Sequence, residues 1–162
     1  MGWLHRLDRL VGRIVAAAQW LALPLILLLF LQWPLRDLVR CCSREANDLG
    51  QIAFALFVAV SVTAATRAGT HLASDVLAYR YSPRTRRRLR QAGALVAILP
   101  WALFIVVAGK PFVVQSVLGL EAFPDSYNPG YFLIKAALWL FAILMITQAL
   151  LDIVRPQPLD DV

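Results

Sequence analysis

The adjacent pair Cys41 and Cys42 is the feature of this sequence best suited to redox chemistry. Two thiols on an exposed connection could exchange with a substrate disulfide. However, a disulfide between neighbouring residues is strained, and quinone-linked thiol oxidation needs further cysteines to relay electrons. We therefore expect two small side chains in a loop, and we keep a membrane thiol oxidoreductase as an alternative function.

The two histidines, His5 and His71, are the other residues that could carry chemistry. His71 precedes Asp75 by four positions, so the two side chains can interact on one helix. One imidazole and one carboxylate do not complete a zinc site, which needs three or four protein ligands. Both histidines also lie outside the long apolar blocks in which a membrane cytochrome would hold its haem. We expect no catalytic residue, no metal and no cofactor.

Long apolar blocks determine the elements that must position these residues. Hydrophobic residues make up 60% of the 162 residues and charged residues 16%, well below the roughly 25% of a soluble domain. About 20 apolar residues cross a hydrocarbon core of about 30 Å. We expect spans at about residues 14–34, 49–66, 91–109 and 131–153 in one membrane domain over residues 1–162. Beyond Lys110 the sequence stays apolar through Leu120, and whether the third span continues there is open.

Two amphipathic segments accompany the spans. Residues 3–13 alternate apolar and charged side chains at helical spacing, which predicts a helix in the membrane interface. Residues 67–90 are predicted to form a second amphipathic segment that becomes basic, with Ser82 and Pro83 as the N-cap and first turn of a helix. The arginines between 84 and 90 adjoin a span, so membrane lipids explain them better than nucleic acid does.

The distribution of Lys and Arg among the connections predicts the orientation. If the N-terminus is cytoplasmic, eleven basic residues lie inside and four outside, with Lys135 within the last span. Basic residues are enriched on the cytoplasmic side of membrane proteins. We therefore expect an all-α integral membrane protein with four transmembrane helices, interfacial amphipathic helices and both termini in the cytoplasm.

The spans carry few groups that could bind a transported solute. Secondary transporters use ionisable residues and broken helices near the midplane, and these spans contain no Asp or Glu at mid-depth. A self-assembling small transporter would have to build its site from Gln51, Thr147 and Gln148. Such side chains commonly form hydrogen bonds between membrane helices, so this function is kept only as an alternative.

Several stretches resemble one known family in their order and spacing. These are residues 47–49, residues 66–77 with His71 and Asp75, the basic stretch 82–86, Glu121, and residues 129–135 leading to Lys135. On a four-span frame they resemble the small membrane subunit (DctQ-type) of tripartite ATP-independent periplasmic (TRAP) transporters. The resemblance covers nearly the whole chain.

This resemblance implies a multi-pass protein of the bacterial inner (cytoplasmic) membrane and two protein partners. One is a large transmembrane subunit that carries the substrate and sodium sites, and the other is a periplasmic substrate-binding protein. The chain would then be a non-catalytic scaffold for sodium-coupled uptake of an organic acid, anchoring the large subunit and helping to dock the binding protein. The candidate partner or ordering residues are Arg67, His71, Asp75, Glu121 and Lys135.

Overall fold

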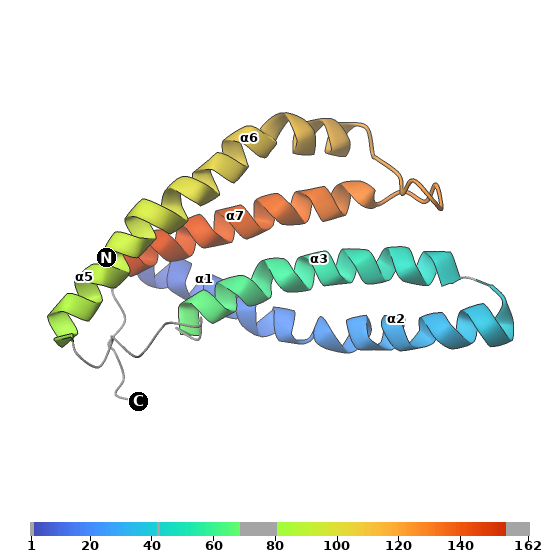
Figure 1. Ribbon diagram of the computed structural model, residues 1–162, viewed down its shortest axis with the longest axis horizontal. Coiled ribbons are helices and arrows are strands. Elements are labelled where there is room, and N and C mark those ends of the chain that lie inside the picture. Colours follow the sequence, from blue (N-terminus) through green and yellow to red (C-terminus); the bar gives the residue numbers. More distant parts are fainter. Residues whose placement is uncertain (1, 42, 69–80, 155–162) are drawn as a thin grey trace.

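The computed structural model describes residues 2–41, 43–68 and 81–154 and consists mainly of long helices. Among these residues, four helical stretches are long and apolar enough to cross a membrane: Arg6–Val39, Arg44–Arg67, Arg84–Leu118 and Tyr131–Val154. They form two antiparallel hairpins, α2 with α3 and α6 with α7, and both hairpin connections lie at the same end of the bundle (Figure 1). The predicted all-α membrane fold with four spans is confirmed.

The first stretch is divided into α1 (Gly2–Gln19), α2 (Ala22–Pro34) and a π-helical segment, η1 (Leu35–Val39). Leu21 donates its backbone N–H to Ala18 O at 3.0 Å, a tighter turn than that of an α-helix. Pro24 lies four residues after Trp20, and a proline ring clashes with the carbonyl at that distance. The amphipathic helix therefore ends at Gln19, and the predicted boundary at residue 13 is wrong.

Helix α3 (Ser43–Ala68) begins earlier than the predicted span at residue 49. The charged stretch before Leu49 predicted a loop, yet Glu45 in the first turn complements the helix dipole. Arg40 makes the turn before α3 with a φ of 54°. The early start puts Asn47 and Asp48 on a helix, which fixes the directions of their side chains.

The third stretch joins α5 (Pro83–Gly93), the π-helical η2 (Ala94–Ile98) and α6 (Leu99–Leu118). Ser82 is the N-cap of α5, because its hydroxyl accepts the backbone N–H of Thr85 at 3.3 Å, as the sequence indicated. Helix α6 passes through Pro111 and ends at Leu118. The third span therefore continues past Lys110 instead of ending at Gly109.

Helix α7 (Tyr131–Val154) lies at the centre of the bundle and packs against α6 and α3. Small side chains lie where these helices meet: Ala102 on α6, Ala142 on α7 and Thr63 on α3 are all fully buried. Small residues let membrane helices approach closely. Helix α1 packs across α3 and α7, where Ala18, Val60 and Leu144 form a buried cluster.

We name the two ends of the bundle by what they carry. The loop end holds η1 and the α6–α7 connection, residues 119–130, and the basic end holds α1, α5 and the last turn of α7 (Figure 1). Of the amphipathic segment predicted at 67–90, residues 69–80 lie outside the described residues. His71 and Asp75 lie in that stretch too, so their predicted roles stay predictions.

Candidate functional site

An ion pair between Glu121 and Lys135 fastens the α6–α7 connection to the first turns of α7. Lys135 Nζ donates to Glu121 Oε2 at 2.5 Å. The same Nζ lies 4.0 Å from the ring centroid of Phe112 on α6 and 5.3 Å from that of Tyr131. Cation–π attraction adds to the ion pair at such distances. Two of the candidate residues from the sequence are thus in direct contact.

The pair stabilises the ionised form of Glu121. Glu121 precedes α7 and lies outside the candidate spans. The hydrogen bond from Lys135 lowers the pKa of the Glu121 carboxyl below its usual value, because it stabilises the ionised form. Since the Lys135 side chain is only 14% exposed, the carboxylate also provides the counter-charge that this ammonium needs.

Asp48, on the second turn of α3, makes a second attachment to the same connection. It is buried, and its Oδ2 accepts hydrogen bonds from Ser126 Oγ at 2.5 Å and from Asn128 Nδ2 at 3.1 Å. In the sequence, Asp48 stands out only as part of the family-like stretch 47–49. Its partner Asn128 lies 80 positions away in the sequence, so local spacing could not reveal the contact.

The connection itself is tightly folded. Leu120 and Tyr127 have φ values of 45° and 58°, and Gly130 has a φ of 135°, which side chains rarely adopt. A Cβ atom on Gly130 would also lie 3.3 Å from Ile52 Cδ1, so glycine permits the close approach to α3. Phe123 is buried and meets the edge of Tyr131 at 5.4 Å between ring centroids. The connection therefore presents a fixed surface.

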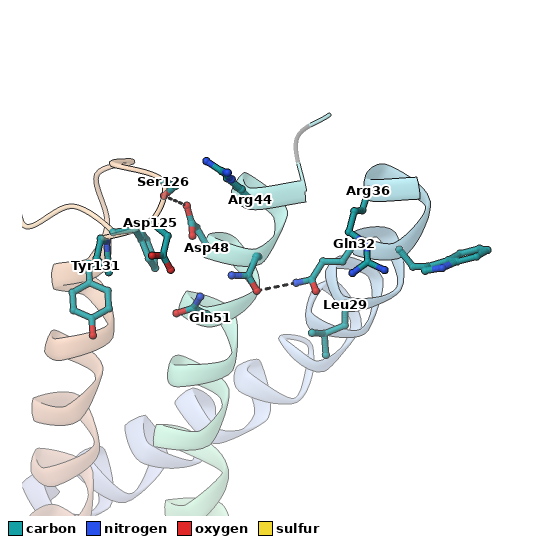
Figure 2. A pocket seen from close by; sticks show the side chains of 13 residues that line it. Leu29, Gln32, Arg36, Arg44, Asp48, Gln51, Asp125, Ser126 and Tyr131 are labelled. Carbon is teal, nitrogen blue, oxygen red and sulfur yellow. Dashed lines mark hydrogen bonds between the residues drawn. The ribbon is translucent and has the colours of Figure 1, made fainter. Parts of the chain in front are cut away.

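A groove of about 800 Å³ opens at this end between α2, α3 and the α6–α7 connection (Figure 2). We call it the loop-end groove; its charged and polar lining includes Arg36, Arg44, Asn47, Asp48, Gln51 and Asp125. Gln32 donates to Asn47 at 3.4 Å and joins α2 to α3 beside the groove. The lining carries charges of both signs, unlike the apolar surfaces of the spans.

A second polar network closes the basic end. Arg67 on α3 pairs with Asp8 on α1 at 2.6 Å, and Arg90 on α5 lies 3.6 Å from Asp152 on α7. Gln148 donates to Asp152 at 3.1 Å within α7. Arg67 was a candidate from the sequence, but its partner Asp8 was not, and the Arg90–Asp152 pair was missed. The Asp8–Arg67 and Arg90–Asp152 ion pairs each join distant parts of the chain, so the spacing of residues in the sequence does not reveal them.

The residues proposed for a solute site of a small transporter lie in different parts of the bundle. Gln51 lines the loop-end groove, whereas Gln148 is buried near the basic end and Thr147 donates to the carbonyl of Ile143 on its own helix. Within one copy of the chain the structure does not bring these three residues together. Cys41 is exposed, and Cys42 lies outside the described residues. The described residues contain no group of three His, Cys, Asp or Glu side chains that could hold a metal.

The fold and these contacts define a class: a multi-pass helical membrane protein whose paired charges fasten the ends of its helices. The family model of the tripartite ATP-independent periplasmic transporters, DctQ component, matches residues 25–158, and the chain belongs to this family. No curated protein and no solved structure matches the chain. The match begins within α2, so α1 lies outside the matched region. The chain is therefore a small membrane subunit of a TRAP transporter.

Proposed function

We propose that this chain is a non-catalytic scaffold of a sodium-coupled TRAP transporter that takes up an organic acid through the bacterial inner membrane. The distribution of charge is the observation that supports this most directly. The charged groups Asp48, Arg67, Lys135 and Asp152 lie near helix ends and have partners in the protein. Between these ends, residues 49–66 and 136–151 contain no charged side chain that could bind sodium or a carboxylate.

The anchoring role is supported by the unequal burial of the spans. Helix α7 is the most enclosed of the four candidate spans among the described residues. Helices α2 and α6 expose large apolar side chains along their length: Ile26, Leu27, Phe30 and Trp33 on α2, and Trp101, Phe104, Val107 and Phe112 on α6. A large transmembrane subunit would pack on one of these faces and lipid on the other. Helix α1, tied to α3 by the Asp8–Arg67 pair, would lie in the cytoplasmic interface and resist tilting.

The docking role is supported by the fixed shape of the loop end. In the proposed orientation, with both termini in the cytoplasm, this end faces the periplasm. The Glu121–Lys135 and Asp48–Ser126 contacts hold the α6–α7 connection on two sides. Tyr127, 84% exposed at its tip, would be available to a periplasmic binding protein. Aromatic side chains on preorganised loops are favourable binding contacts.

Purification of the tagged chain from its host in nanodiscs tests the proposal. We expect a larger polytopic protein to co-purify in near-equal amount. Proteoliposomes holding both proteins should take up an organic acid when a sodium gradient and a binding protein are added. The chain alone should give no uptake. Recovery of the chain without a partner, or uptake by the chain alone, would refute the scaffold function.

A further inference from the structure

The loop-end groove continues into an apolar stripe on the same face of α3. Arg44 and Gln51 line the groove, and Phe54 and Val58 follow at helical spacing, with exposed fractions of 57% and 39%. Leu29 on α2, 55% exposed, borders the groove where the stripe begins. This face is therefore charged at the helix end and apolar towards the middle of the span. A phospholipid has the same order of parts along its length, a charged headgroup followed by apolar chains.

The groove contains a positive and a negative side chain that could each bind a charged group of a ligand. Arg44 and Asp125 have no ion-pair partner within 4.0 Å among the described residues. The neighbouring Asp48 also lines the groove, and its Oδ2 already accepts hydrogen bonds from Ser126 and Asn128. A guanidinium binds a phosphate with strong, charge-assisted hydrogen bonds. Asp125 would repel a purely anionic headgroup but would accept hydrogen bonds from an ammonium group.

The volume of the groove and the Trp side chain that lines it suit a lipid headgroup. Its volume of about 800 Å³ lies within the range of small-molecule sites. Trp33, which lines the groove and is 61% exposed, is the residue type that gathers at the level of the headgroups. A headgroup in the groove would therefore lie beside an exposed Trp side chain.

We propose that the loop-end groove binds a phospholipid with a primary ammonium headgroup, such as phosphatidylethanolamine. The phosphate lies at Arg44, the ammonium at Asp125, and one acyl chain along Phe54 and Val58. A primary ammonium suits Asp125 because it donates hydrogen bonds, which a quaternary ammonium cannot do. The proposal does not depend on the scaffold function.

Native mass spectrometry of the delipidated protein, with its large subunit if the two co-purify, tests this site. The probes are phosphatidylethanolamine, phosphatidylglycerol and water-soluble glycerophosphoethanolamine. We expect phosphatidylethanolamine to bind best and the soluble headgroup at least about tenfold more weakly, because it lacks the apolar chain. Equal binding of the soluble headgroup would show that the site takes a free phosphate ester and would overturn the lipid assignment.

Matched variants locate the two charges. Arg44→Gln should weaken the binding of both lipids by about tenfold, the size of one charged hydrogen bond. Asp125→Asn should weaken phosphatidylethanolamine and not phosphatidylglycerol. Lys110→Gln, at an exposed position of α6 outside the groove, is the control and should change the binding of neither lipid.

Three results would overturn the proposal. The first is unchanged binding in Arg44→Gln, and the second is an equal effect of Asp125→Asn on both lipids. The third is a complex without bound lipid in which a photo-crosslinker at position 54 reacts with the large subunit, since the stripe would then be a protein interface. Recovery of Arg44→Gln with the same melting temperature as the parent shows that lost binding is not lost folding.

Discussion

The pairing of Glu121 with Lys135 has a definite dependence on pH. Because the pKa of Glu121 is lowered in the folded protein, the pair contributes its full stabilisation above the ordinary carboxyl pKa of about 4.5. The contribution is lost as the pH falls through the lower, folded value. We expect the protection factors of residues 119–130, which compare each exchange rate with the intrinsic rate at the same pH, to stay high from pH 8 to pH 5 and to fall at lower pH.

Lys135→Met should remove this protection, because it keeps an unbranched side chain but removes the ammonium that contacts both Glu121 and the Phe112 ring. The expected result is lower protection factors in residues 119–130 at neutral pH, with little further decrease on acidification below pH 4.5. Lys110→Met is the matched control, because Lys110 is an exposed lysine of α6. A variant that keeps the acid-induced change of the parent would contradict the role given to Lys135.

The Asp8–Arg67 pair predicts a measurable coupling between α1 and α3. Its side chains are 42% and 21% exposed, so solvent screens part of the attraction. We expect Asp8→Asn and Arg67→Gln each to lower the free energy of unfolding in micelles. A double-mutant cycle should give a coupling of about 1 kcal/mol or less. A coupling of zero would show that the pair does not hold α1 in place.

The exposed Cys41 bears on the alternative redox function. Replacing Cys41 and Cys42 together with serine should leave solute uptake by the assembled transporter within about twofold of the parent, because the proposed scaffold function uses no thiol chemistry. Uptake supported by the binding protein is the measurement. Loss of uptake with unchanged assembly would favour thiol chemistry over the scaffold function.

At the level of the element, the break between α1 and α2 is attributed to Pro24. Pro24→Ala restores an N–H that can donate to Trp20 O, so the two helices should join. A straight helix would place spin labels at positions 10 and 38 about 42 Å apart, at about 1.5 Å per residue. We expect the measured distance to lengthen towards this value. Pro100→Ala, in another span, should leave the distance unchanged.

The limits of helices were harder to predict than their existence. Apolar blocks identified all four spans, because a span must be apolar over its whole length. The start of α3 at Ser43 was missed, because its first turns are charged and are stabilised by contacts with the α6–α7 connection. The break after Gln19 was placed too early because hydrophobic periodicity, and not the position of Pro24, set the predicted boundary.

At the level of the whole molecule, the family-like stretches indicated the protein class before any contact was known. Glu121 and Lys135 were chosen by resemblance, and the structure adds that they bind each other. Arg90 and Asp152 were not chosen, because each looks like an ordinary charge beside a span until the fold brings α5 and α7 together. Ion pairs between residues that are distant in the sequence are the part of the site that cannot be predicted from a single sequence.

The unbroken passage from α5 through η2 to α6 has a mechanical consequence. The candidate span Arg84–Leu118 has 35 residues, which is about 52 Å of helix at about 1.5 Å per residue. A hydrocarbon core is only about 30 Å thick, and tilts beyond about 40° are rare. Part of this rod must therefore protrude into the headgroup layer or beyond. The angle at which it leans will follow the thickness of the surrounding bilayer, so the protein should respond to lipid chain length as a gauge of membrane thickness.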